Sequence, residues 1–106
     1  MPIPKNYNEI EVLPRLPTSI TDGSKNVTTA GSRVQIVTAT TYCIRIIITA
    51  KAANTGTIWV GGATVANGSG IPLVALQSVL IDIDDLSKIY LDSTVSLEGI
   101  TYAYLV

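Results

Sequence analysis

Short runs of alternating apolar and polar residues fill this chain from Val27 onward, and they constrain its fold more than any other feature. Isoleucine, valine and threonine dominate this part, phenylalanine is absent, and no window carries the 3.6-residue apolar stripe of a helix. In the clearest run, residues 42–51, one side of an extended strand would carry Ile44, Ile46, Ile48 and Ala50. We therefore predict an all-β domain.

Turn residues separate these runs at intervals of about ten residues. Glycine, asparagine, serine and proline gather at residues 54–56, 61–62 and 67–72. About seven or eight short antiparallel strands at such spacing are typical of a single β-sandwich, including the jelly-roll type. A chain of 106 residues is long enough for one core and too short for two.

The first 26 residues differ in composition, because they hold four of the five prolines. Proline fixes φ and removes a backbone donor, which favours an extended N-terminal arm at residues 1–26, ahead of a β-sandwich domain at residues 27–106. The same composition also fits a first strand preceded by a mobile tail. The apolar side chains that an arm would offer to a partner are Ile3, Tyr7, Ile10, Val12, Leu13 and Leu16.

Charge and hydropathy exclude several classes of function. Only 14% of the residues are charged and the net charge is −1, so no basic field would attract nucleic acid or a membrane surface. The opening residues do not read as a signal peptide, and the longest apolar stretch, residues 44–50, is interrupted by Arg45 and Thr49. Low charge instead favours self-association, because little repulsion opposes it.

The residue inventory also predicts that the chain is not an enzyme. There is no histidine, and the single Cys43 has neither a base to activate it nor a second thiol with which to bind zinc. Asp82, Asp84 and Asp85 lack the spacing of a calcium loop, and a solvated strand edge is a better interpretation of them than a metal site or a glycosidase pair. We predict no catalytic residue, no metal and no cofactor.

The aromatic residues are the best candidates for binding. Trp59 alternates with Ile58 and Val60, so it should point away from the core, and Tyr90 and Tyr102 lie in strands that could run near it. Such residues can pack in a core, anchor a protein interface or stack on a sugar ring. All three alternatives are open at this point for a platform of Trp59, Tyr90 and Tyr102.

Three short motifs carry a family resemblance. They are Asn54 followed by TGTIWVG at 55–61, GIPL at 70–73, and IYLD at 89–92. Across residues 27–106 the chain resembles the small β-domains of tailed-bacteriophage virions, and most of all capsid decoration, or cement, proteins. The resemblance implies a protein made in the host cytoplasm that sits on the capsid surface of the virion. Its partner would be the major capsid protein, and its own state often a homotrimer.

The resemblance further implies a mechanism in which the N-terminal arm lies across neighbouring capsid subunits and bridges them. Two alternatives belong to other classes. One is a glycan-binding or adhesion module that uses Trp59 and nearby tyrosines, and the other is a structural component of the tail or baseplate. A β-sandwich alone does not decide among them.

Overall fold

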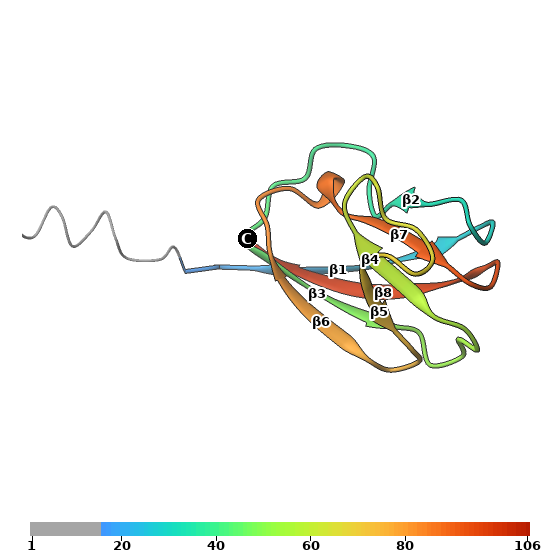
Figure 1. The fold of residues 1–106 in the computed structure, drawn as a ribbon. Helices are drawn as coiled ribbons and strands as arrows, with labels where there is room; N and C mark the ends of the chain where they lie inside the picture. Colours follow the sequence, from blue (N-terminus) through green and yellow to red (C-terminus); the bar gives the residue numbers. More distant parts are fainter. Residues whose placement is uncertain (1–15) are drawn as a thin grey trace, which may run out of the picture.

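The structure is a computed structural model that describes residues 16–106. Within that range the chain forms two four-stranded antiparallel sheets packed face to face (Figure 1). The strands are β1 (Ile20–Val27), β2 (Val34–Gln35), β3 (Arg45–Ala50), β4 (Ile58–Gly61), β5 (Ile71–Leu73), β6 (Ser78–Asp82), β7 (Tyr90–Ser93) and β8 (Glu98–Leu105). One short 3-10 helix, η1 (Leu86–Lys88), precedes β7.

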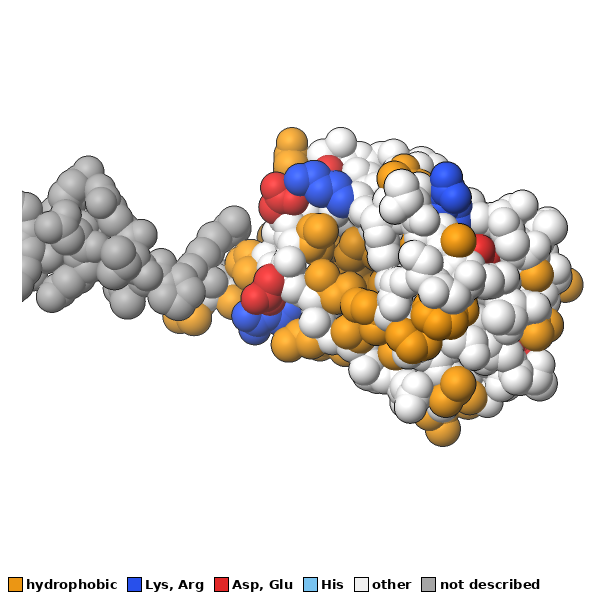
Figure 2. Space-filling view, viewed as in Figure 1, with side chains coloured by type: hydrophobic (Ala, Val, Ile, Leu, Met, Phe, Trp, Pro, Cys, Tyr) orange, Lys and Arg blue, Asp and Glu red, His pale blue; other side chains and the backbone are white. Residues whose placement is uncertain are grey.

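Sheet A has the strand order β1-β8-β3-β6, and sheet B has the order β2-β7-β4-β5. This pattern, in which the chain crosses repeatedly between two antiparallel sheets, is that of an eight-stranded jelly roll. The predicted all-β sandwich of jelly-roll type is therefore confirmed. β6 and β5 are edge strands, and Figure 2 shows hydrophobic side chains gathered on the side of the domain where β6 lies.

The core lies between the sheets and follows the alternation of the strands. In β3, Ile46, Ile48 and Ala50 are buried, whereas Ile47 and Thr49 point to the other side and are only partly covered. Each fully buried isoleucine contributes roughly 1.5–3 kcal/mol relative to an exposed one. The remaining strands and η1 complete the core with Val27, Ile58, Val60, Leu73, Leu86, Leu91 and Ile100.

The predicted boundary of the arm at residue 26 is wrong for residues 20–26. These residues belong to β1, which pairs with β8 along its whole length, from Ile20 opposite Leu105 to Val27 opposite Glu98. β1 is an edge strand with mostly polar and exposed residues, so it lacks the apolar alternation by which strands are detected. The sandwich begins at Ile20, as in the alternative of a first strand.

Two glycines allow β1 and β8 to lie close together. Gly23 faces Tyr102, and a Cβ at Gly23 would stand 2.6 Å from the ring of that tyrosine. Gly99 faces Asn26, and a Cβ there would collide with the carbonyl oxygen of Lys25. A side chain at Gly99 would therefore require the neighbouring strand to move, and a side chain at Gly23 would require the ring of Tyr102 to move.

The turn at residues 54–56 is fastened to β8 by the side chain of Glu98. Its Oε2 accepts the backbone N–H of Thr55 at 2.7 Å, and its Oε1 accepts that of Gly56 at 2.9 Å. These hydrogen bonds favour the charged carboxylate and hold the pKa of Glu98 below its ordinary value. The first of the three sequence motifs thus begins in a turn whose geometry is set from another strand.

Candidate functional site

The outer face of sheet A is the broader of the two outer sheet faces, because its strands are longer than those of sheet B. Because direct partners in antiparallel strands point to the same side, three cross-strand rows can be traced on it. From β1 to β6 these rows are Ile20, Leu105, Arg45 and Asp82; Asp22, Ala103, Ile47 and Leu80; and Ser24, Thr101, Thr49 and Ser78. One end of the face therefore carries the apolar pair Ile20 and Leu105 beside the charged pair Arg45 and Asp82, and the other end is rich in hydroxyl groups.

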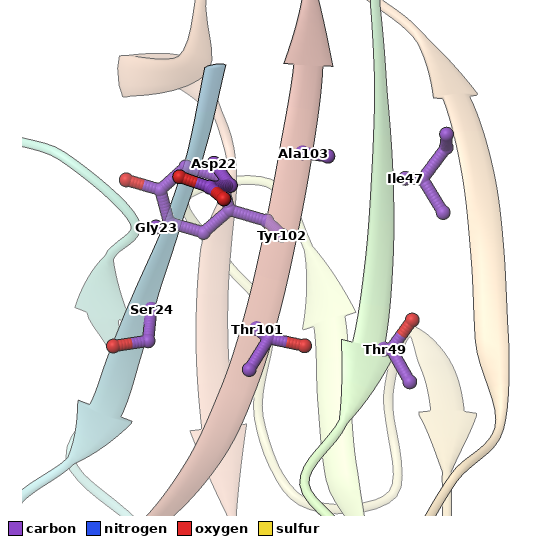
Figure 3. A pocket seen from close by; sticks show the side chains of 8 residues that line it. All are labelled: Asp22, Gly23, Ser24, Ile47, Thr49, Thr101, Tyr102 and Ala103. Atoms are coloured by element: carbon purple, nitrogen blue, oxygen red, sulfur yellow. The ribbon is translucent and has the colours of Figure 1, made fainter. Parts of the chain in front are cut away.

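A shallow groove runs along β8 on this face (Figure 3). It forms because β8 presents the small side chains of Thr101 and Ala103, while Asp22 and Ile47 rise on either side of them. The groove has a volume of about 540 Å³. Its lining is completed by Gly23, Ser24, Thr49 and Tyr102.

The charges and hydroxyl groups of the face are largely paired with one another. Nε of Arg45 donates to Oδ1 of Asp82 at 2.6 Å, and the hydroxyl oxygens of Thr49 and Ser78 lie 2.6 Å apart. Asp22 is the one carboxylate of the groove. A neutral surface of small polar and apolar side chains suits contact with another protein better than it suits chemistry.

Of the groove residues, sequence analysis singled out only Tyr102, and it did so for a different site. Their shared position depends on β1, β8 and β3 being neighbours in sheet A, although they lie far apart in the chain. One local signal was available, because Gly99, Thr101 and Ala103 place small residues at every second position of β8. Once β8 is known to lie in the middle of a sheet, that pattern predicts a depression in the sheet surface along the strand.

Most of the predicted arm residues, namely Ile3, Tyr7, Ile10, Val12 and Leu13, lie outside the described residues. Leu16 is described, and 77% of its surface is exposed. The N–H groups of Thr18 and Ser19 donate to the carbonyl of Val106 at 2.6 and 2.9 Å. The N-terminal segment, residues 1–19, therefore joins the domain beside Val106, at the end of the outer face of sheet A that carries Ile20 and Leu105.

The predicted aromatic platform is not assembled. Trp59 and Tyr90 share the outer face of sheet B, where they oppose Asp92 and Gly61 respectively, so the predicted outward direction of Trp59 is confirmed. Tyr102 belongs to sheet A, where it is opposite Ile48 on the inner face, although it also borders the groove. Sequence analysis could not separate these residues, because alternation gives the face of a strand and not the sheet to which it belongs.

The surroundings of the three aromatics also differ. Trp59 is half-buried, and within residues 16–106 its Nε1 has no hydrogen-bond partner although the atom is buried. Tyr102 packs against Tyr104, with ring centroids 6.2 Å apart and planes inclined by 26°. Burial, and the neighbouring Tyr104, raise the pKa of Tyr102. Tyr102 thus packs as part of the domain rather than as an open stacking surface.

The three aspartates at the end of β6 and just after it each have a separate partner. Asp82 pairs with Arg45, and Asp84 accepts a hydrogen bond from Nζ of Lys88 at 2.8 Å. Oδ1 of Asp85 accepts the N–H groups of Thr41 at 3.0 Å and Ser87 at 2.9 Å, and these bonds lower the pKa of Asp85. In the part of the chain that the structure describes, no cluster of three potential metal ligands occurs.

Cys43 is half-buried beside the core, as a small residue with a weak donor would be. Its thiol donates to the carbonyl of Ile83, with the sulfur 3.1 Å from the oxygen. Burial, together with the negative charges of Asp85 and Asp84, raises the pKa of this thiol. A thiol held in its protonated form is a poor nucleophile.

Comparison of the chain with models of protein families, with curated proteins and with solved structures gave no match. From residue 16 to the end, the chain has no helix with the length and hydropathy needed to cross a membrane. By fold it is a small jelly-roll domain, with a shallow and nearly neutral groove on the outer face of sheet A. Jelly rolls serve many functions, so the fold does not specify one.

Proposed function

We propose that this protein is a non-enzymatic structural protein of a tailed-phage virion that binds the outer surface of the capsid as a decoration protein. The observation that carries the proposal is the outer face of sheet A, with the N-terminal segment joining the domain at the end that carries Ile20 and Leu105. The resemblance of the motifs at 55–61, 70–73 and 89–92 supports the choice of the major capsid protein as partner.

In this proposal the domain binds one capsid subunit and the N-terminal segment binds the neighbouring one. The groove over Thr101 and Ala103 receives a ridge of the capsid surface, and the apolar side chains from Ile3 to Leu16 lie across an adjacent subunit. Separation of the two subunits would then expose apolar surface to water, at a cost of about 25 cal/mol for each Å². Self-association, which the resemblance implies as a homotrimer, would strengthen attachment because linked copies rebind at high effective concentration.

The test of the docking face is co-sedimentation of the purified chain with matured, undecorated heads of the virus that encodes it, with immature shells for comparison. Thr101→Arg would fill the groove with a long charged side chain, and we expect it to weaken binding at least about tenfold. Thr64→Arg, at an exposed threonine of the β4–β5 loop, is the matched control and should bind as the wild type does. If the unmodified chain binds neither kind of shell, the proposal is refuted, and binding to isolated tails would assign it to the tail.

The test of the N-terminal segment uses a deletion of residues 1–15. A longer deletion to residue 20 would enter β1 and remove the hydrogen bonds from Thr18 and Ser19 to Val106. We expect the shortened chain to keep its β-sheet circular dichroism and to lose capsid binding. Unchanged binding would show that the segment does not grip the capsid.

A further inference from the structure

The four sheet edges of the domain differ in how well they are protected from pairing with another chain. β5 has Pro72 at its centre, β2 is two residues long, and β1 carries polar residues that include Asp22 and Lys25. β6 has the sequence Ser-Val-Leu-Ile-Asp, without proline or lysine, and its Leu80 is 57% exposed. An edge strand of this kind is a template for a further strand.

The hydrogen bonds of β3 show which backbone groups of β6 are hydrogen-bonded within the sheet. The N–H of Ala50 donates to Gln77 on the β6 side at 2.9 Å, whereas the N–H of Lys51 donates to Gly99 on the β8 side at 3.1 Å. Backbone groups of successive residues in a strand point to opposite sides. In β3, therefore, Ile46 and Ile48 direct their N–H and C=O groups toward β6.

The register then identifies the backbone groups of β6 that have no partner within residues 16–106. Ile46 is opposite Ile81 and Ile48 is opposite Val79, so Val79 and Ile81 direct their backbone groups toward β3. The backbone N–H and C=O groups of Ser78, Leu80 and Asp82 consequently point out of the sheet. These three residues are evenly spaced, and Leu80 is at the centre.

This edge is complementary to itself. When a second copy is laid antiparallel with Leu80 opposite Leu80, Ser78 comes opposite Asp82 and Val79 comes opposite Ile81. Each free N–H of one copy then meets a free C=O of the other. The leucines form an apolar pair on the outer face, and a serine hydroxyl faces each Asp82 carboxylate, so no like charges stand directly opposite each other.

We propose that two copies of this chain associate edge to edge through β6. Their two sheets A would become one continuous sheet across a two-fold axis, with β6 beside β6. The hydrophobic side chains gathered near β6 in Figure 2 would come together at the junction. The assembly closes at two copies because residues 16–106 of each chain offer one such edge. The resemblance to decoration proteins implies a trimer instead, and the inference does not depend on capsid binding.

The first test is the mass of the full chain in solution, measured by sedimentation velocity over a wide range of concentration. A reducing agent is present so that Cys43 cannot link two copies through a disulfide. We expect a concentration-dependent transition from 11.2 kDa to twice that mass. A single chain at every concentration, or a trimer, would overturn the proposal.

The second test replaces Leu80 with lysine, which sets two positive charges opposite each other across the axis. We expect Leu80→Lys to weaken association at least about tenfold, and its exposed position should leave the fold intact. Leu97→Lys is the matched control, because Leu97 is 69% exposed in the turn between β7 and β8. It should associate as the wild type does, and an equal effect of both variants would overturn the proposal.

The third test measures the hydrogen-exchange rates of the backbone amides of β6. The N–H of Ile81 should exchange slowly at all concentrations, because it faces β3. The N–H of Leu80 should exchange quickly in the dilute chain and slowly in the associated one, and Leu80→Lys should keep it fast. If the Leu80 amide is equally fast at high concentration, the contact lies elsewhere. If it is already slow in the dilute chain, residues of the same chain cover the edge, and the proposal is also wrong.

Discussion

Single carboxylates fix two turns of this domain by accepting backbone N–H groups from distant parts of the chain. Asp85 holds Thr41 and the start of η1, and Glu98 holds Thr55 and Gly56. Both carboxylates are stabilised in their charged form, so the pKa of each is lower in the folded chain than its ordinary value of 3.8 for Asp85 and 4.5 for Glu98. The stability of the domain should therefore depend on pH at the acid end.

The sign of that dependence follows from linkage. A group with a lowered pKa contributes its full stabilisation above its unfolded pKa and loses it as the pH falls through the folded value. We expect the urea midpoint to be level near neutral pH and to fall below about pH 4. Asp85→Asn and Glu98→Gln should each lower the neutral midpoint and flatten the acid decrease. An acid decrease of the same size in the variants would show that other groups cause it.

The close approach of β1 and β8 makes Gly99 sensitive to a single methyl group. In Gly99→Ala the new Cβ would meet the Lys25 carbonyl and lie 2.6 Å from the Cα of Asn26, so the strands must separate. We expect a loss of about 1–3 kcal/mol in the free energy of unfolding, measured by urea titration. Gly62→Ala is the control, because a Cβ at Gly62 would meet no atom within 4 Å. Similar losses in both would contradict a special role for Gly99.

At the scale of elements, substitutions in β3 can test whether the alternation of residues along a strand determines which side chains are buried. Ile48 is fully buried and Ile47, its neighbour in the strand, is half-buried on the outer face. Ile48→Ala should reduce the free energy of unfolding by about 2–5 kcal/mol, because it leaves a cavity between the sheets. Ile47→Ala should cost no more than about 1 kcal/mol, since only part of its side chain is covered. Equal costs in urea unfolding would mean that the two faces of β3 do not differ as described.

The elements that could be predicted from sequence are those with one apolar face. β3 and β4 alternate clearly, and their buried positions agree with that alternation. β1 could not be predicted, because its stability comes from backbone pairing with β8 and from Gly23 and Gly99 rather than from apolar side chains. The local alternation of apolar residues predicts which side of a strand is buried. It does not predict which strands pair when they lie far apart in the chain.

The candidate site was beyond sequence reasoning for the same reason. The groove requires Asp22, Ile47 and Ala103 to become neighbours, and they come from three strands that meet only in sheet A. The prediction of an aromatic platform was wrong because it grouped Trp59 with Tyr102, and these two residues lie in different sheets. A candidate surface on a sandwich depends on strand order, which short alternating runs do not specify.

At the scale of the whole molecule, the low charge predicts how the protein should bind. The net charge is −1, and Arg45 and Asp82 on the outer face of sheet A neutralise each other. The proposed contact of this face with the capsid should therefore depend little on ionic strength, because neutral surfaces are not steered by long-range fields. Co-sedimentation at low and high salt should give affinities within about threefold of each other. A steep loss with salt would indicate that charged groups carry the contact.

The attachment of the N-terminal segment beside Val106 has a mechanical consequence. Tension applied between the two ends of the domain, at Ser19 and Val106, would open β1 from β8 like a zipper, because the hydrogen-bonded pairs would bear the force one after another. Tension between the N-terminal segment and the groove of sheet A would instead pull β1 along its own axis, and all of its pairs would resist together. A protein attached through its N-terminal segment and the groove would therefore resist tension between these two attachments strongly. It would resist tension between Ser19 and Val106 only weakly, and the proposed attachment does not apply tension in that direction.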